Sequence, residues 1–526
     1  MTMMAGPNGQ PIFILRDGTE RTTGRTAQHN NIAAAMAVAD AVRTTLGPMG
    51  MDKLLVSGGG ENVLITNDGA TILREIDIDH PTAKLVIEVS KNQEEKCFDG
   101  TTSAVVIAGE LLKEAEGLLQ QQIHPTIIAR GYRMASQEAL KELENLGWGP
   151  TGDDFFGVAH TALTGKSAEA AIEVISKMCV EAVGMTADGE TFDMDNVKVL
   201  SFEGGAYDES ALLPGVLVEK EKLHSTMPTE IEKADILLLM SAIEVKKTKT
   251  DMQFNVNDPS QVEKFLAQEE KAIKEMVDSI IESGANVVVC NKDVDDLAAH
   301  YLAKAGVYCI KRVKKSDMES LHRLTGASLV NDDISMDALG SCSLKEVKFG
   351  EHRCTLIEKE GAKTVTAILR GSTGHSVDEI ERAFDDALGV VGLAFNDGTL
   401  VAGGGAIHAW LSYHLRKLAA SKGGRVGMAI EAFANALEVI PRTLAENAGL
   451  DPVDTILDLR KHESFVHGVS TEDGIVDMID EGVIEPRSVI SNAISAATEA
   501  SVMVLRIDDV ISMKGGAPPA PPQMGM

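Results

Sequence analysis

The sequence predicts a multidomain α+β protein in which an α/β segment is inserted into a mainly helical one. The first observation is length, because the chain has 526 residues and single hydrophobic cores usually stop growing near ~250–300 residues. The second is pattern: long helical stretches occupy both ends of the chain, whereas short apolar runs alternate with helical segments in the middle. The expected order is therefore helical, then α/β, then helical.

The first part of the chain is expected to be mostly helical. An Ala-rich stretch at residues 27–45 ends at Gly47-Pro48, which is a helix stop signal. Further helical patterns cover residues 82–96 and 101–122. Asn67-Asp68-Gly69 lies between two short apolar runs, and this tripeptide is typical of a β-hairpin turn.

The middle of the chain predicts a small layer of parallel strands. Three short apolar runs are the expected strands: residues 235–240, 286–290 and 307–313. One intervening helix is well defined, because Asp258 can cap it, Pro259 suits its first turn and Gly284 suits its end. The segment before this helix mixes Lys with apolar residues and is expected to project from the domain; its apolar members are Met252, Phe254 and Val256.

After Arg370 the chain returns to long helical patterns. The expected helices cover residues 377–395, 406–418, 427–447 and 489–505. The tail from Lys514 is rich in Pro and Gly, and such a segment cannot bury enough apolar surface to fold.

Composition and charge exclude several classes of protein. Acidic residues exceed basic ones by 79 to 49, and the resulting net charge of -30 argues against general nucleic-acid binding. No apolar run approaches the ~20 residues that a membrane span needs, and we expect no secretory signal. The six Cys are widely spaced without a C-x-x-C pair. They are expected to be reduced packing residues of a cytoplasmic protein.

One short segment has the features of an anion site. Thr101, Thr102 and Ser103 open a helix and follow Asp99-Gly100. Backbone N–H groups at a helix start favour an anion, and Gly lets a phosphate approach closely. Asp99 beside a phosphate could hold Mg²⁺, although a simple helix cap explains it as well.

Other candidate residues have ordinary explanations when taken alone. Leu46-Gly47-Pro48 could form a second phosphate-contacting turn or only end a helix. Asp386 lies off the apolar stripe of its predicted helix and could face solvent. The run from Gly403 to Gly405 permits close backbone approach or acts as a hinge. No Walker A phosphate-binding loop is present. No G-x-S-x-G or H-E-x-x-H motif is present either, so covalent or zinc catalysis is not expected.

Read together and in order, these segments resemble the group II chaperonins, the archaeal thermosome and eukaryotic cytosolic chaperonin type, over essentially the full chain. The motifs that carry the resemblance are TLGPMGMDK (45–53), NDGATIL (67–73), DGTTSAVV (99–106), LTGK (163–166), ERAFDDAL (381–388), AGGGA (402–406), DGIVDM (473–478) and GVIEP with LRIDDVI (482–511).

The resemblance implies three domains. A mainly helical equatorial ATPase domain would comprise residues 1–151 and 407–526, with a disordered tail from about 514. A hinge-like α/β intermediate domain would comprise residues 152–219 and 370–406. An α/β apical domain would occupy residues 220–369, with a helical protrusion near 245–275.

The resemblance also assigns site residues. Asp99 would be the Mg²⁺ ligand, and Asp68 and Asp386 would orient and activate the water, as aligned hydrolysis of ATP requires. Lys166 would sense the γ-phosphate. The expected nucleotide contacts are Leu46, Gly47, Pro48, Gly69, Gly100, Thr101, Thr102, Ser103, Gly404, Gly405, Asp477 and, at the ribose, Glu485. The implied cofactors are ATP and Mg²⁺, with K⁺ as an optional further cation.

Three residues depart from the family pattern. Met49 stands where a Lys is usual, and His408 stands where a Glu is usual. Phe98 replaces a Gly before the Asp-Gly-Thr-Thr motif, so that turn is expected to adopt φ values that a bulky residue tolerates. These changes predict an active but slower ATPase.

The function implied is an ATP-dependent chaperone that encloses non-native proteins when its built-in lid closes. The partners would be those clients and identical or paralogous subunits in a double ring, with no nucleic acid and no membrane. The alternatives are a passive client-holding ring with impaired hydrolysis and a soluble small-molecule phosphotransferase, for which no acceptor motif is found.

Overall fold

The computed structural model describes residues 3–5, 11–13, 19–56, 63–166, 171–189, 191–244, 259–331, 334–350 and 352–513. Most of the projecting segment, including Met252, Phe254 and Val256, and the tail from Lys514 lie outside these residues. The chain divides into two units. Unit 1 comprises Met1–Pro150, Thr164–Ser167 and Thr399–Met526, and unit 2 comprises Thr151–Leu163 and Ala168–Gly398. Each unit is described by itself.

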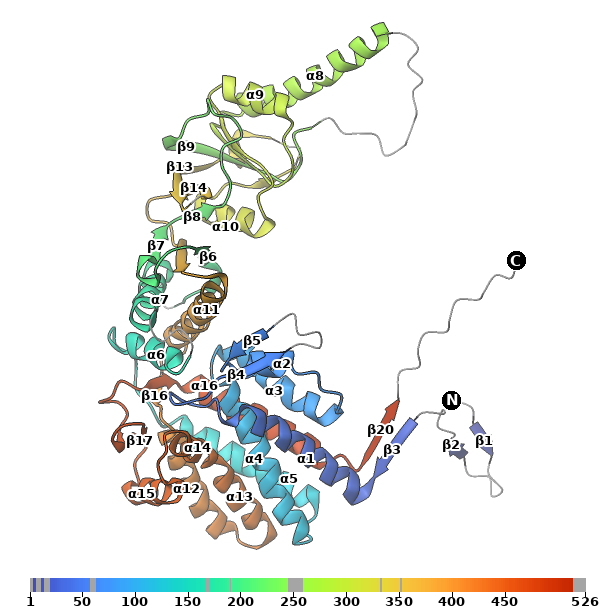
Figure 1. The fold of residues 1–526 in the computed structure, drawn as a ribbon, viewed down its shortest axis with the longest axis vertical. Helices are drawn as coiled ribbons and strands as arrows, with labels where there is room; N and C mark the ends of the chain where they lie inside the picture. The colour runs from blue at the N-terminus through green and yellow to red at the C-terminus, as the bar shows by residue number, and fades with distance from the viewer. Residues whose placement is uncertain are drawn as a thin grey trace. The chain divides into compact units, whose positions relative to one another are not determined.

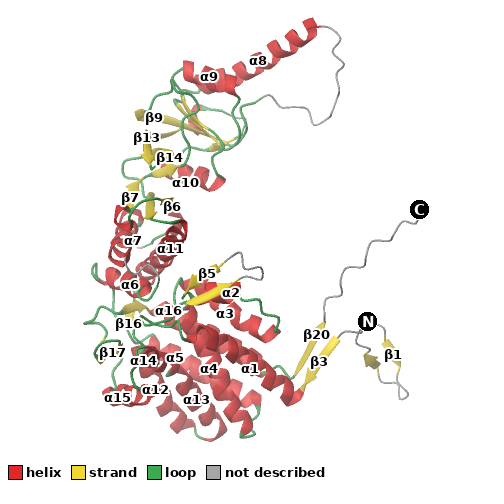
Figure 2. Cartoon of the chain, viewed as in Figure 1, coloured by secondary structure: helices red, strands yellow, loops and turns green. Residues whose placement is uncertain are grey.

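Unit 1 is a helical core built from both ends of the chain (Figures 1 and 2). Its centre is α4, which buries Leu111, Leu112 and Ala115 among neighbours from α1, α13 and α16. The helices of unit 1 are α1 (Gly24–Arg43), α2 (Gly69–Glu75), α3 (Pro81–Cys97), α4 (Thr101–Gln120), α5 (Pro125–Leu143), α12 (Ala406–Lys422), α13 (Gly424–Leu437), α14 (Val439–Asn447), α15 (Pro452–His462) and α16 (Arg487–Leu505).

Short antiparallel ribbons accompany these helices. The paired strands are β1 (Met3–Ala5) with β2 (Pro11–Phe13), β3 (Thr19–Thr23) with β20 (Asp509–Met513), β4 (Lys53–Val56) with β5 (Val63–Thr66), β16 (Leu400–Ala402) with β19 (Ile484–Pro486), and β17 (His467–Ser470) with β18 (Gly474–Asp477). The β3–β20 ribbon joins residues from opposite ends of the chain.

Two predictions for unit 1 are wrong. Asn67-Asp68-Gly69 does not form a hairpin: β5 pairs with β4 instead, and Asp68 is the N-cap of α2. An Asn-Asp-Gly sequence suits both a turn and a helix start, and here it forms the start of α2. The helix predicted at residues 427–447 is interrupted at Glu438, because Pro441 has no N–H to continue the helical hydrogen bonds.

One described helix, α16, is long and apolar enough to cross a membrane by length and composition alone. However, 61% of its apolar window is buried inside the protein. It packs against α3, α4 and α5, as a central core helix does.

Unit 2 contains two sheets. The smaller sheet has the order β6-β15-β7 and is packed with α11 and α7, which in turn contact α6. The elements are α6 (Asp154–Leu163), α7 (Ile172–Thr186), β6 (Val197–Glu203), β7 (Ala211–Pro214), β15 (Val365–Gly371) and α11 (Gly374–Asp397).

The larger sheet has the order β11-β10-β9-β13-β14-β8, and β12 also pairs with β9. Strands β9, β10, β11 and β12 are parallel neighbours, which confirms the predicted α/β layer. Its elements are β8 (Val216–Val218), β9 (Glu230–Leu239), α8 (Pro259–Glu282), β10 (Val287–Cys290), α9 (Asp296–Lys304), β11 (Tyr308–Ile310), α10 (Lys315–Thr325), β12 (Leu329–Val330), β13 (Gly340–Phe349) and β14 (His352–Glu358).

Candidate active site

The turn between α3 and α4 presents Asp99. Phe98 has φ 60 and Gly100 has φ 74, so a left-handed residue lies on each side of Asp99. The N-cap of α4 is Gly100, and no side chain caps this helix start. The interpretation of Asp99 as a helix cap is therefore wrong. The first turn of α4, at Thr101, Thr102 and Ser103, keeps its backbone donors for another acceptor.

The expectation for Phe98 is also wrong. The turn keeps a left-handed backbone at this position although the residue is bulky. A side chain with a Cβ costs roughly 1–2 kcal/mol in this conformation, so surrounding contacts must hold it.

The start of α2 lies against the start of α4. The Oδ2 atom of Asp68 accepts a hydrogen bond of 2.8 Å from the N–H of Thr71. A Cβ added at Gly69 would overlap the Thr102 side chain. Glycine at position 69 is therefore required by this close approach, and Asp68 comes near the Asp99 turn.

The pKa of Asp99 depends on the charges of two other predicted site residues, Asp68 and Lys166. Burial raises the pKa of the Asp99 carboxyl and the charge of Asp68 raises it further, while Lys166 and the Gly100 N–H partly offset this. Residues 164–167 belong to unit 1, so Lys166 is grouped with the two carboxylates. Asn67 donates a hydrogen bond from Nδ2 to the Gly165 carbonyl and helps to hold this loop.

The residues present fit a magnesium–phosphate group. Two carboxylates, an uncapped helix start and one Lys are the donors that such a group uses. Among the described residues, no cluster of three or more His, Cys, Asp or Glu side chains could hold a metal by itself. Mg²⁺ typically takes one or two carboxylates and completes its ligands with phosphate oxygens and water, so this small donor set suits it.

Residues of α14 hold the turn at Leu46, Gly47 and Pro48 in place. Asn447 donates a hydrogen bond of 2.8 Å from Nδ2 to the Leu46 carbonyl. Gly47 has φ 83, and a Cβ there would overlap the Leu444 side chain. A Cβ added at Gly165 would lie 2.7 Å from the Gly47 carbonyl oxygen, so the Lys166 loop and this turn are neighbours.

The glycine run before α12 lies close to two other segments of unit 1. Gly404 and Gly405 have φ 60 and φ 77. A Cβ at Gly404 would overlap Met478, and one at Gly405 would lie 2.9 Å from the Pro441 side chain. Asp477, next to Met478, accepts a hydrogen bond of 2.9 Å from the Ile479 N–H. The Asp477 carboxylate thus supports its own turn, and its contact with a nucleotide stays a prediction.

Glu485 lies opposite Val401 in the β16–β19 ribbon. Burial raises the pKa of the Glu485 carboxyl to about 8, and the charge of Asp99 contributes to this shift. Glu485 therefore lies in the electrostatic range of the Asp99 turn. Its predicted ribose contact is not tested by this coupling.

Asp386 lies on α11, which belongs to unit 2 and is described by itself. The charge of its neighbour Asp385 helps to raise the pKa of the Cys179 thiol in α7. Cys179 Sγ also donates a weak hydrogen bond of 3.8 Å to the Phe384 carbonyl. Burial, with the charges of Glu381 and Asp386, raises the pKa of Asp385 to about 7. The catalytic role of Asp386 stays a prediction.

The two other departures from the family pattern are placed differently. Met49 is 54% exposed, whereas His408 is 5% exposed in α12. Neither ring nitrogen of His408 has a hydrogen-bond partner among the described residues. Burial lowers the pKa of His408 to about 4, so the ring is neutral near pH 7.

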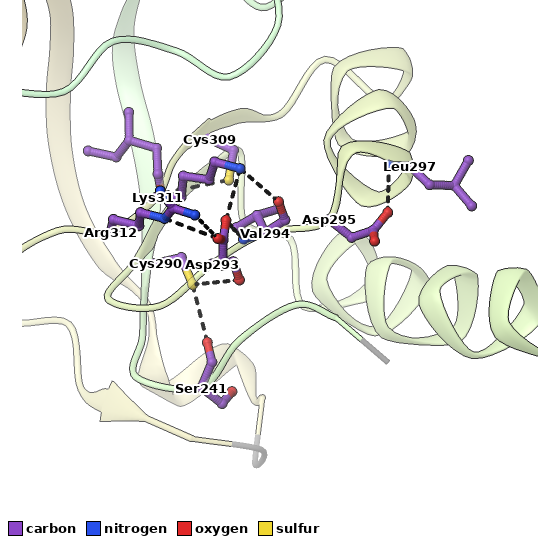
Figure 3. Close-up of polar contacts among 10 residues, drawn as sticks. Ser241, Cys290, Asp293, Val294, Asp295, Leu297, Cys309, Lys311 and Arg312 are labelled. Atoms are coloured by element: carbon purple, nitrogen blue, oxygen red, sulfur yellow. Dashed lines mark hydrogen bonds and ion pairs between the residues drawn. The ribbon is translucent and has the colours of Figure 1, made fainter. Parts of the chain in front are cut away.

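A second polar cluster lies at the ends of β10 and β11, and Figure 3 shows it. Asp293 accepts hydrogen bonds from Lys311 and Arg312, which lower the pKa of its carboxyl strongly. Cys290 Sγ lies 3.2 Å from the Ser241 carbonyl, and burial raises the pKa of this thiol to about 11. The Asp293 carboxylate is shared by two cations and the thiol stays protonated, so this cluster is structural.

Sequence reasoning missed the residues that hold the site's backbone. Gln93 donates a hydrogen bond to the Asp99 carbonyl, and Asn447 donates one to the Leu46 carbonyl. The available signal was weak: Gln93 is a polar residue on the buried side of α3.

A model of the TCP-1/cpn60 chaperonin family matches residues 38–515. The thermosome subunit beta of Archaeoglobus fulgidus is 49% identical over 97% of this chain and 96% of its own length. The thermosome subunit alpha of the same organism is 48% identical over 97% and 96%. A thermosome subunit of Methanopyrus kandleri is 50% identical over 98% and 97%. The chain belongs to the TCP-1/cpn60 chaperonin family and is a group II chaperonin subunit, an ATPase that assists protein folding.

Proposed function

We propose that the ATPase centre of this chaperonin is assembled around the Asp99 turn of unit 1. The observation that carries the proposal is the close packing of the α2 start against the α4 start, at Gly69 and Thr102, and of the Lys166 loop against Gly47. The electrostatic coupling of Asp99 to Asp68, Lys166 and Glu485 agrees with this packing. Structural ion pairs would place compensating cations around such carboxylates, but in the described part of the chain Lys166 is the one cation that offsets the raised pKa of Asp99. A site built to receive a divalent cation and phosphates accounts for this imbalance.

Each residue has a separate task. Mg²⁺ would neutralise charge on the phosphates when it is bound. Asp99 would ligate that cation, and the first-turn N–H groups of α4 would hold phosphate oxygens. The turn at Leu46–Pro48 and the loop at Gly404–Gly405 would line the nucleotide. Lys166 would meet the terminal phosphate, and Asp68 would orient the attacking water.

Asp386 would supply the second carboxylate for water activation. Because it belongs to unit 2, it can act only when the two units are arranged for reaction. Hydrolysis would then be coupled to the movement that closes the folding chamber. This coupling is what separates an active machine from a passive client-holding ring.

The subunit would assemble with identical or paralogous copies. The β4–β5 and β3–β20 ribbons are two-stranded, so each has edges that can pair with another chain. Leu54, Val56 and Ile65 on the first ribbon and Ile511 on the second are more than half exposed. Separately, α15 exposes Val453 and Leu457. We assign the ribbons to contacts within a ring and α15 to contacts between two rings.

The proposed location is the cytoplasm. All six Cys are free and buried, as expected for a protein of a reducing compartment. Non-native proteins would be the clients.

The test compares purified wild-type protein with Asp99→Ala and Asp386→Ala. We expect Asp99→Ala to lose Mg²⁺-dependent nucleotide binding and turnover. Asp386→Ala should bind nucleotide normally but hydrolyse it at least 100-fold more slowly. Unchanged turnover in both variants would contradict the proposed centre. Client folding that persists in an inactive Asp386→Ala ring would favour the passive holding function.

A further inference from the structure

Gln93 is a fully buried amide whose hydrogen bonds are all directed to other segments. It lies in α3 with 0% exposure. Its Nε2 donates to the Asp99 carbonyl at 2.8 Å and to the Val489 carbonyl at 3.1 Å. Its Oε1 accepts from Asn492 Nδ2 at 2.7 Å. Both polar atoms of the amide are therefore satisfied, which a buried group requires.

These bonds fasten a turn whose conformation is unfavourable by itself. Phe98 and Gly100 are both left-handed, and the Asp99 carbonyl held by Gln93 lies between them. There is no spare room around this turn. A Cβ at Gly100 would lie 2.9 Å from Val489 Cγ1 and 3.1 Å from Gln93 Nε2. Such a backbone conformation persists only when contacts with the surrounding structure hold it in place.

The same amide connects two parts of the site that are far apart in sequence. Val489 and Asn492 belong to α16, which begins directly after β19. Glu485 lies in β19 and interacts electrostatically with Asp99. Gln93 therefore fixes the Asp99 turn relative to the segment that carries Glu485.

We propose that Gln93 is a positioning residue of the ATPase centre, which holds the Asp99 carboxylate and the first turn of α4 in the geometry that binds magnesium–nucleotide. This inference rests on the proposed site. Gln93 does not touch the nucleotide, since its amide is fully engaged with backbone carbonyls and Asn492. It acts through the backbone of the Asp99 turn.

The same helix offers a matched control. Thr82 is 1% exposed at the opposite end of α3, and its Oγ1 donates to Asn31 Oδ1 at 2.9 Å. Thr82→Val removes this buried hydrogen bond without touching the Asp99 turn. Gln93→Met keeps the length of the side chain but removes both of its donors. Both variants weaken the packing of α3, so a purely structural role predicts similar behaviour.

The experiment measures Mg-ADP affinity by calorimetry, the KM for Mg-ATP and the denaturant midpoint of the nucleotide-free, assembled protein. We expect both variants to lower the midpoint. Only Gln93→Met should weaken Mg-ADP binding, by roughly tenfold, and raise KM similarly. Equal affinity in Gln93→Met and Thr82→Val would overturn the inference.

Two further variants separate the possible failures. If Gln93→Met does not assemble, Asn492→Ala removes only the support of the Gln93 amide oxygen. It should weaken Mg-ADP binding about threefold, and wild-type affinity would overturn the inference. Asp99→Ala tests the site itself. If Asp99→Ala binds Mg-ADP normally, the proposed site is wrong; if it loses binding while Gln93→Met does not, only the role of Gln93 is wrong.

Discussion

Replacing Glu438 by Gln should destabilise unit 1 by about 3 kcal/mol. Glu438 is 1% exposed at the junction of α13 and α14. Its carboxylate accepts hydrogen bonds from Arg460 at 2.8 and 2.5 Å, from Arg416 at 3.1 Å and from Ser412 at 2.9 Å. A neutral amide would remove this counter-charge from both guanidinium groups, and Arg416 would keep the longer ion pair with Glu431, at 4.0 Å.

The magnitude follows from the exposure of the partners. Removing one member of a buried ion pair typically costs about 3–5 kcal/mol, because the remaining charge loses its compensation. The side chains of Arg416 and Arg460 are 25% and 37% exposed, so water can hydrate part of each guanidinium. The lower end of the range, about 3 kcal/mol, is therefore expected.

The assay is urea unfolding of the assembled protein, followed by circular dichroism at one fixed protein concentration. Midpoints are compared because a multidomain oligomer does not unfold in two states. The control is Glu88→Gln, which breaks an exposed pair with Lys91 of 3.2 Å and should shift little. A Glu438→Gln midpoint equal to that of Glu88→Gln would refute the reasoning.

The same network sets a pH dependence. Burial acts to raise the pKa of Glu438, but hydrogen bonds and charges from Arg460 and Arg416 lower it below its usual 4.5. A carboxyl with a lowered folded-state pKa contributes its full stability above pH 4.5. That contribution is lost as the pH falls through the folded-state value. Glu438→Gln should therefore be less sensitive to acid below pH 4.5 than the wild type.

Three further outcomes are expected. Burial lowers the pKa of His408 from 6.5 to about 4, so as the pH falls the unfolded chain binds a proton before the folded chain does. The free energy of unfolding should therefore fall by up to roughly 3 kcal/mol between pH 6.5 and pH 4. The accompanying decline in urea midpoint should be smaller in His408→Leu. Phe98→Gly should be more stable than Phe98→Ala by about 1 kcal/mol in urea unfolding, since only the Ala variant keeps a Cβ in the left-handed backbone. The opposite order of stability would contradict the assigned backbone conformation. Gly117→Ala in α4 should stabilise by about 0.5–1 kcal/mol, because nothing lies within 4 Å of the added Cβ; a lower urea midpoint would show that this helix position is crowded.

The sequence was informative where a pattern is long and local. Helices such as α4 and α11 carry an apolar stripe over many turns, and the strands β10 and β11 are short and continuously apolar. These elements were placed within a few residues. The break at Glu438 was also readable, since Pro441 cannot continue a helix, but the apolar period on both sides concealed it.

The errors arose where two local structures have the same sequence signature. Asn-Asp-Gly suits a hairpin or a helix start, and the contact between Gly69 and Thr102 comes from a segment that the local pattern cannot include. At Phe98 the residue type predicted an ordinary turn, but the Asp99 carbonyl held by Gln93 belongs to a left-handed one. Tertiary contacts overrode local preference in both cases.

The sequence predicts the reacting groups of the candidate site but not the residues that support them. The carboxylates and glycines came from motifs, whereas the supports are polar side chains that bond to backbone carbonyls in distant segments. α14 illustrates this most clearly. Asn447 at its end bonds the Leu46 carbonyl, and Pro441 near its start lies against Gly405. One helix of 9 residues therefore sets the distance between the two loops that we propose to line the nucleotide. Its start adjoins Glu438, so the buried ion network that stabilises unit 1 also holds both walls of the proposed ATP site in register.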